Sequence, residues 1–378
     1  MPWQEVSTVS LRKEFVLLAV QDGVNISELC RRFGISRKTA YKWLGRFEET
    51  GGAGLQDRSR RPHRSSNCTP QEVQQLVLSL RDAHPAWGGR KLRRRLQDLG
   101  HEALPSASTL TGILRRNGRL DALQSARHTA WRRFEHDAPN LLWQMDFKGH
   151  FAAGAGRCHP LTVLDDHSRY ALRLEACANQ QAVTVQGKLT GAFRRYGIPE
   201  RMTMDNGAPW GSGGGHSYTS LTAWLIRLGI RVSHSRPYHP QTQGKDERFH
   251  RTLNAEVLQG NVFDNLGQCQ QRFDQWRDIY NQQRPHEAIG MAPPASRYRP
   301  SARGFPETPP AIEYAPGDIV RKVQAKGEIH YRGSAFKIGS AFHGYPVALR
   351  PAAADGVMEV YFCQQCVAKI NLRMPQCA

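Results

Sequence analysis

Apolar residues recur at helical spacing in the first fifty positions of the chain. This spacing predicts three short helices, over 11–22, 28–33 and 37–48, with a glycine-containing break after the first and a tight turn at Gly34 before the third. Ser27 and Ser36 have side chains suited to cap the second and third helices. The pattern is typical of a helix-turn-helix domain, which we expect over residues 8–50.

The third predicted helix separates an apolar stripe from a polar face. Ala40, Trp43, Leu44 and Phe47 share the stripe and should face the core. The outward residues near the N-terminal end are polar or basic, as in a recognition helix that reaches DNA: Arg37, Lys38, Tyr41 and Lys42. The alternative is a three-helix bundle with a solvated basic face.

A second helical module follows a glycine- and arginine-rich linker over 51–67, which could run along phosphates. In this module, expected over 68–121, Thr69 and Pro70 start one helix, and Ser106 or Ser108 caps another. The helix between them, 90–99, begins with a dense run of positive charge that includes Arg90 and Lys91. We expect these two residues to contact nucleic acid, although such a run can also be an ordinary solvated face.

The middle of the chain, about 134–300, has a different pattern. Short alternating or apolar runs come first, and helices and strands then alternate. This order predicts an α/β domain with one mixed, five-stranded sheet. The predicted strands are 141–147, 159–165, 169–176, 200–204 and 230–235, and the predicted helices are 182–196, 218–228 and 244–258.

A proline-rich linker over 293–310 precedes a region of short alternating strands between glycines. We expect a small β-barrel over 311–374. Cys363 and Cys366 form a lone CxxC in this region. Without a second pair of ligands at suitable spacing, structural cysteines are favoured over a zinc site.

The composition favours a polyanionic partner. The 378 residues carry a formal net charge of +19 and a pI of about 10, with the basic residues spread along the chain. No secretion signal or apolar run long enough for a membrane helix is present, and the cysteines are scattered. We therefore expect a reduced, cytoplasmic, nucleoid-associated protein with no membrane partner.

Three carboxylates are the best candidates for chemistry. Asp146 and Asp205 end predicted strands, and Glu247 lies on a predicted helix. Such acids can hold Mg²⁺, and two ions can activate the attacking oxygen and neutralise the leaving one at a phosphodiester. Asp246 is the closest rival to Glu247, because neighbours on a helix point about 100° apart and only one should face the metal. Phe249 and Leu253 on the same helix should face the core, but this periodicity alone does not decide between the two acids. Asp165, Asp166 and Glu175 are further competing carboxylates, of which the first two are most simply explained as part of a turn between two strands.

Residues 134–300 resemble the integrase core of the DDE transposases, the retroviral-integrase-like group with an RNase H-like fold. The resemblance rests on WQMDFKG (143–149), VLDDHSRY (163–170), TMDNG (203–207), RPYHPQTQGKDERFHRTL (236–253) and YNQQRPH (280–286). It implies that Asp146 and Asp205 are the family's two aspartates and that Glu247, not Asp246, is the third acid. The interval 247 − 205 = 42 is longer than is usual in the family, and the glycine-rich stretch 211–215 accounts for it as a loop insertion.

The N-terminal half resembles bacterial insertion-sequence transposases, through a helix-turn-helix followed by a module containing HPAWGGRKL (84–92). The resemblance implies an enzyme that binds terminal repeats, releases 3′ ends and transfers them to target DNA. It implies two Mg²⁺ ions, replaceable by Mn²⁺, and a dimer or tetramer on double-stranded DNA. Phosphate contacts are expected beside the site from Lys245, Arg248 and Arg251. The alternatives are a DNA-binding regulator with an inactive core and a metal-dependent nuclease that does not join.

Overall fold

The computed structural model describes residues 7–59, 68–120, 135–211, 218–234 and 244–373. Contacts divide the chain into two compact units, 1–68 and 69–378. Each unit is described by itself.

The N-terminal unit is a bundle of three helices, α1 (Thr8–Ala19), α2 (Ile26–Arg32) and α3 (Arg37–Thr50), closed by a 3-10 turn at Gly51–Leu55. Three helices were predicted here, and their order is confirmed. The bundle packs around seven buried side chains: Phe15, Val16, Leu29, Cys30, Ala40, Trp43 and Leu55.

The predicted cap of α3 is confirmed and that of α2 is wrong. Ser36 accepts a hydrogen bond from the backbone N–H of Thr39 at 3.2 Å. The cap of α2 is Asn25, whose side-chain oxygen accepts from the N–H groups of Ser27 and Glu28. Ser27 therefore lies inside the helix that it was expected to cap.

The second unit begins with a helical module of α4 (Gln71–Ala83), α5 (Gly89–Asp98) and α6 (Ala107–Arg116). Ser106 caps α6 as predicted, whereas Pro70, not Thr69, occupies the cap position of α4. Gly89 allows α5 and α6 to approach closely, since a Cβ there would lie 2.5 Å from the carbonyl oxygen of Ala107.

The central sheet is mixed, as predicted. Its order is β2-β3-β1-β5-β6, with β4 also paired to β3. β1 runs parallel to β5, and β5 parallel to β6, whereas the β2–β3, β1–β3 and β3–β4 pairs are antiparallel. The five predicted strands are present, together with a short additional strand, β2. The strands are β1 (Trp143–Phe147), β2 (Phe151–Ala153), β3 (Gly156–Asp165), β4 (Ala171–Cys177), β5 (Arg201–Met204) and β6 (Arg231–His234).

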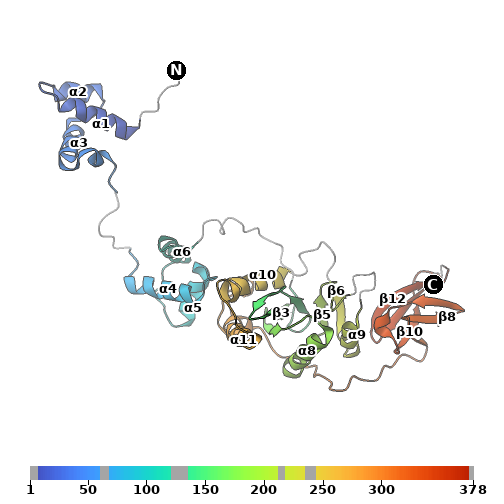
Figure 1. The fold of residues 1–378 in the computed structure, drawn as a ribbon. Helices are drawn as coiled ribbons and strands as arrows, with labels where there is room; N and C mark the ends of the chain where they lie inside the picture. Colours follow the sequence, from blue (N-terminus) through green and yellow to red (C-terminus); the bar gives the residue numbers. More distant parts are fainter. Residues whose placement is uncertain (1–6, 60–67, 121–134, 212–217, 235–243, 374–378) are drawn as a thin grey trace. The chain divides into compact units, whose positions relative to one another are not determined.

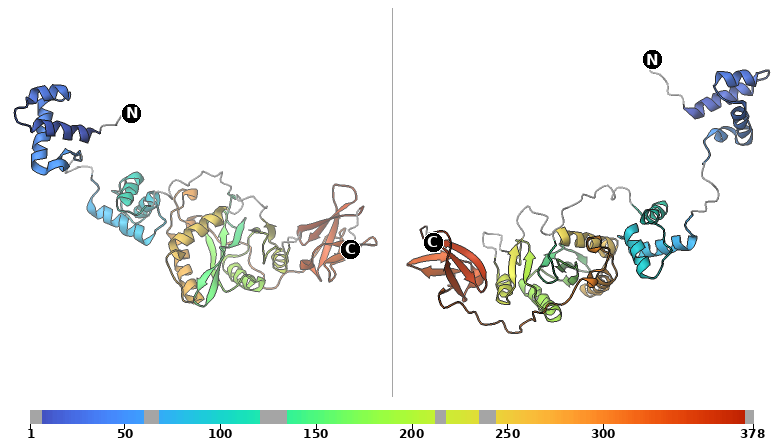
Figure 2. Two further views of the ribbon diagram at one scale, coloured as in Figure 1. Left: turned by 45° about the horizontal axis from the view of Figure 1, so that its top comes forward. Right: turned by 180° about the vertical axis from the view of Figure 1, so that it is seen from behind.

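Helices cover both faces of this sheet (Figures 1 and 2). α8 (Ala182–Tyr196) and α9 (Ser220–Arg227) pack with side chains of β1, β5 and β6. α10 (Gly244–Leu253) and α11 (Leu266–Gln282) pack with side chains of β3 and β4. The predicted helix over 244–258 is α-helical only to Leu253, and its last turn, Asn254–Leu258, is π-helical.

The C-terminal region forms an open four-stranded sheet and a separate hairpin. The sheet order is β12-β11-β10-β7, and β8 pairs only with β9. Among the described strands, the hydrogen-bonded path ends at β7 and β12, so the closed barrel expected from the sequence is not observed. The strands are β7 (Ile319–Lys322), β8 (Glu328–Tyr331), β9 (Ser334–Lys337), β10 (Pro346–Pro351), β11 (Val357–Phe362) and β12 (Gln365–Asn371).

The CxxC lies at the connection between β11 and β12. Cys363 has a positive φ of 51°, and the described cysteines, including Cys366, are free thiols. No helix in the described part of the chain combines the length and apolar composition that crossing a bilayer requires.

Candidate active site

Two of the predicted acids are brought together by parallel strands. β1 and β5 are neighbours with Gln144 opposite Thr203. Continuing this register by two residues places Asp146 beside Asp205, at the carboxyl ends of both strands. Adjacent strands lie about 4.8 Å apart, so the carboxylates share one edge of the sheet.

The electrostatics of this pair suit a cation. Burial and, to a smaller extent, the charge of Asp205 together raise the pKa of Asp146 to about 7. Asp205 accepts hydrogen bonds from the N–H of Gly207 at 3.0 Å and from the indole of Trp210. These donors fix the orientation of Asp205. No basic side chain in the described part of the chain forms an ion pair with Asp146.

The third acid is where sequence and structure diverge. Asp246 lies on the inner face of α10 with Phe249 and Leu253, the two residues predicted to face the core, and it is 1% exposed. Burial, and then the charges of Asp146 and Asp166, hold the pKa of Asp246 well above its usual range. Neither of its carboxylate oxygens has a hydrogen-bond partner among the described residues.

Glu247 points to the other side of α10. Its side chain is 66% exposed and pairs with Arg251 at 3.0 Å, one turn further along the helix. The structure therefore brings Asp146 and Asp205 to one end of the sheet. It buries Asp246 on the inner face of α10, where the charge of Asp146 acts on it, and places Glu247 on the outer face of the same helical turn. Among the described residues, no three His, Cys, Asp or Glu side chains are grouped closely enough to hold a metal ion.

Sequence reasoning missed His250, which connects α10 to the first acid. Its Nε2 lies 2.9 Å from the Thr162 hydroxyl, which donates to the backbone oxygen of Asp146 at 3.0 Å. Burial lowers the pKa of His250 to about 4, so the ring is neutral near pH 7. The signal was available, because His250 follows Asp246 by four residues and must share its helical face.

The acids at 165 and 166 are structural, in agreement with their reading as turn residues. Asp165 accepts from the N–H groups of Asn140 and Ser168 at 2.7 and 2.8 Å. Asp166 accepts from the Gln144 amide at 2.8 Å and forms an ion pair with Lys245. Lys245, which was predicted to contact phosphate, is thus partly buried and paired with Asp166.

The remaining predicted DNA contacts differ in exposure. Arg90 is exposed and lies 3.7 Å from Glu287, whereas Lys91 is half-buried. Burial, and then the charge of Arg284, lower the pKa of Lys91 to about 7. Arg248 is exposed, and Arg251 is paired with Glu247. On α3 all four predicted contact residues are exposed: Arg37, Lys38, Tyr41 and Lys42.

Comparison with known families covers most of this architecture. Integrase core domain models match residues 136–240 and 228–294, and the model "IS481 family transposase, C-terminal domain" matches 318–377. A helix-turn-helix domain matches 12–63, and a homeodomain-like domain matches 39–114. The chain is also similar over 93% of its length to a putative transposase of insertion sequence IS5376 from Geobacillus stearothermophilus, at 21% identity and with 85% of that protein covered.

Together these matches indicate an insertion-sequence transposase with a retroviral-integrase-like core. Two further relatives of this transposase are insertion-element proteins without an assigned activity. One, from IS476 of Xanthomonas euvesicatoria, is 31% identical over 42% of this chain, and the other, from IS407 of Burkholderia multivorans, is 26% identical over 47%. The matches span 44% and 61% of those two proteins.

Proposed function

We propose that this transposase binds the terminal repeats of its element, cleaves DNA at the element's 3′ ends and joins those ends to target DNA. The observation that carries the proposal is the Asp146–Asp205 pair at the carboxyl ends of two adjacent parallel strands. A pair of carboxylates in which one pKa is near 7, and in which Asp146 has no basic partner among the described residues, is a site that a divalent cation would stabilise.

We propose Mg²⁺ as the cation, replaceable by Mn²⁺, with two ions per site. The residues that would hold them are Asp146, Asp205 and Glu247. When bound, such ions lower the pKa of an attacking water or 3′-hydroxyl and neutralise the leaving oxygen. The chain itself orients Asp205 through Gly207 and Trp210, and ties the backbone of Asp146 to α10 through Thr162 and His250.

Glu247 is proposed as the third ligand because the GKDER segment matches the family motif at that position. Its present partner does not hold it firmly. An exposed ion pair such as Glu247–Arg251 contributes about 0–1 kcal/mol. Asp246 is the competing candidate, because its buried carboxylate has no hydrogen-bond partner among the described residues and the charge of Asp146 helps to raise its pKa.

We propose that the DNA-binding surface of the N-terminal helices is the exposed end of α3 and that a dimer or tetramer assembles on DNA. The exposure of Arg37, Lys38 and Lys42 together supports this, because recognition helices reach DNA with their first turns. We propose a helix-turn-helix domain over 8–50, a linker over 51–67 and a second helical DNA-binding domain over 68–121. The catalytic core would span 134–300 and the C-terminal β domain 311–374.

Strand transfer by the purified full-length protein tests the proposal. The reaction holds Mg²⁺, a labelled duplex bearing the element end and a plasmid target, with Asp205→Asn in parallel. Joined product from the wild type alone supports a transposase that depends on this site. Cleavage without joining would indicate a nuclease, and tight end binding with no product under Mg²⁺ or Mn²⁺ would indicate a regulator.

A further inference from the structure

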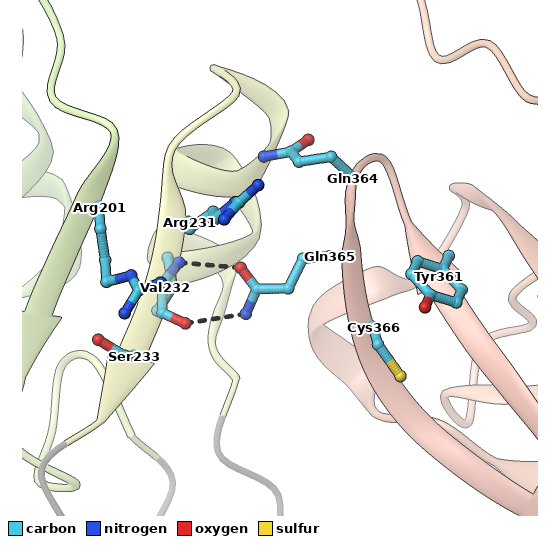
Figure 3. Close-up of a pocket in the computed structure, with 8 residues that line it drawn as sticks. All are labelled: Arg201, Arg231, Val232, Ser233, Tyr361, Gln364, Gln365 and Cys366. Atoms are coloured by element: carbon cyan, nitrogen blue, oxygen red, sulfur yellow. Dashed lines mark hydrogen bonds between the residues drawn. The ribbon is translucent and has the colours of Figure 1, made fainter. Parts of the chain in front are cut away.

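A cavity of about 430 Å³ lies between the edge of the central sheet and the β11–β12 hairpin (Figure 3). Its walls on the sheet side are the first residues of β5 and β6, Arg201 and Arg231, together with Ser233. On the hairpin side they are Tyr361 and Gln364. The cavity is at the opposite end of β5 from Asp205, so it is separate from the candidate active site.

The hairpin is fixed to the sheet edge by one side chain. Gln365 accepts from the N–H of Val232 at 2.8 Å and donates to its carbonyl oxygen at 2.9 Å, the two bonds drawn in Figure 3. It also donates to the Tyr218 hydroxyl at 2.9 Å. The amide therefore satisfies the outer backbone groups of edge strand β6 as a neighbouring strand would. These hydrogen bonds hold the hairpin wall of the cavity against the sheet wall.

The two arginines are placed directly opposite each other. Arg201 and Arg231 are paired in the parallel register of β5 and β6, and both are exposed. No carboxylate in the described part of the chain forms an ion pair with either guanidinium; the adjacent Glu200 pairs with Arg303 at 3.3 Å. Like charges opposite each other destabilise a sheet, so an anion bound here would relieve the repulsion.

The anion that fits this setting is a phosphodiester. Guanidinium groups bind phosphate oxygens through parallel hydrogen bonds. Ser233 and Gln364 add a hydroxyl and an amide to the walls. From Arg201 to Asp205 the strand advances four residues, about 13 Å. This is comparable with the roughly 12 Å width of the DNA major groove, so one duplex can contact both the cavity at Arg201 and the candidate active site at Asp205.

We propose that Arg201 and Arg231 bind a backbone phosphate of DNA in this cavity, away from the site of reaction. The proposal rests on the proposed function in one respect, namely that DNA is the ligand. The phosphate could belong to the element end or to the target, and the chemistry of binding is the same for both.

Fluorescence anisotropy with the full-length protein tests this site. The variant is Arg201→Gln/Arg231→Gln, and the matched control is Arg157→Gln, which removes an exposed arginine of β3 outside the cavity. Two labelled duplexes are used, the element end and an unrelated sequence, between about 50 and 200 mM salt. Thermal midpoints of all proteins are compared first, and the two single variants replace the double variant if it does not fold.

We expect the double variant to bind DNA about tenfold or more weakly, with a salt dependence shallower by about one for the lost phosphate contact. Arg157→Gln should match the wild type. A loss confined to the element end assigns the phosphate to that DNA, and a loss confined to the unrelated duplex assigns it to the target. Wild-type affinity and salt dependence of the double variant on both duplexes would overturn the proposal. Binding does not require catalysis, so failure of strand transfer would contradict the proposed function without affecting this result.

Discussion

Helices α3 and α10 are both short, basic and amphipathic, but they place their polar groups differently. On α3 the basic residues near the N-terminal end are all exposed, and only apolar side chains face the bundle. On α10 a carboxylate, Asp246, is buried among apolar residues with no hydrogen-bond partner among the described residues. Burying an unpaired charge costs several kcal/mol, roughly, unless the group is protonated or a cation binds it. The difference indicates that the polar residues of α3 are available to bind a partner at the surface, whereas Asp246 of α10 affects the electrostatics of acids inside the fold.

The largest expected effect separates the two acids of α10. We expect Glu247→Gln, like Asp205→Asn, to lower the rate of strand transfer by at least about a thousandfold, because each removes a ligand charge needed in the transition state. Asp246→Asn should keep the rate within about tenfold of wild type and raise the thermal midpoint. Burial holds the pKa of Asp246 well above its usual range, so folding near pH 7 must either protonate this carboxylate or bury its charge, and the amide avoids both costs. The measurement is product formation under single-turnover conditions.

The reverse pattern would reassign the site. If Asp246→Asn abolished strand transfer and Glu247→Gln retained it, the third ligand would be Asp246, the buried acid whose pKa is raised partly by the charge of Asp146. Binding of the element end by each variant is the control, since neither substitution touches α3. Loss of end binding in Glu247→Gln would contradict the separation of binding from catalysis.

On α3 the expected effect is on affinity alone. We expect Lys38→Gln/Lys42→Gln to weaken binding of the element end by about tenfold or more and to reduce its salt dependence by about two, because two phosphate contacts are lost. Both side chains are exposed, so the thermal midpoint should not change. Lys13→Gln, an exposed lysine of α1, is the matched control.

Equal losses in the control and in the α3 variant would show that overall charge, not this helix end, determines binding. Titration at several salt concentrations distinguishes the two cases. A loss of affinity that differs between the element end and an unrelated duplex would add that α3 reads base edges.

The comparison also shows what the sequence could predict. Periodicity identified the exposed face of α3 and the inward positions of Phe249 and Leu253, because burial follows apolar spacing. Strand ends predicted Asp146 and Asp205, because adjacent parallel strands bring their carboxyl ends together. Periodicity could not choose between Asp246 and Glu247, since the choice depends on how α10 sits on the sheet.

Contacts between distant segments left no sequence signal. Gln365 bonds the backbone of Val232, which is 133 positions away, and nothing in either segment indicates the pairing. Lys91 was predicted to contact nucleic acid because it lies in a run of positive charge, but its side chain is partly buried, and burial and the charge of Arg284 lower its pKa. Tertiary packing, not local pattern, decides both positions.

A smaller effect is expected on metal affinity as pH changes. Asp146 has a pKa raised to about 7 by burial and by Asp205. Below that pH its carboxyl group is protonated and must lose the proton before it can bind a cation. We therefore expect the apparent affinity for Mn²⁺ to fall, by up to about tenfold per pH unit, as pH decreases from about 7 to about 6. Calorimetry in two buffers of different ionisation enthalpy should show proton release near pH 6, and Asp146→Asn should abolish it.

The smallest expected effect concerns Lys91, which is half-buried, whereas Lys38 and Lys42 on α3 are exposed. Burial and Arg284 lower its pKa from 10.5 to about 7, so between these values the unfolded chain binds a proton that the folded protein does not. The free energy of unfolding should therefore rise with pH over this range and decline as pH falls toward 7. We expect Lys91→Met to flatten this dependence and to stabilise the protein near pH 7 by about 1 kcal/mol, since part of the side chain still contacts solvent.

Arg94→Met, which removes a surface pair with Asp98, is the control and should change the thermal midpoint little. A lower midpoint for Lys91→Met at pH 7 would show instead that Glu287 and Glu256 hold Lys91 in its charged form. Its burial would then stabilise the packing of α5 on the core.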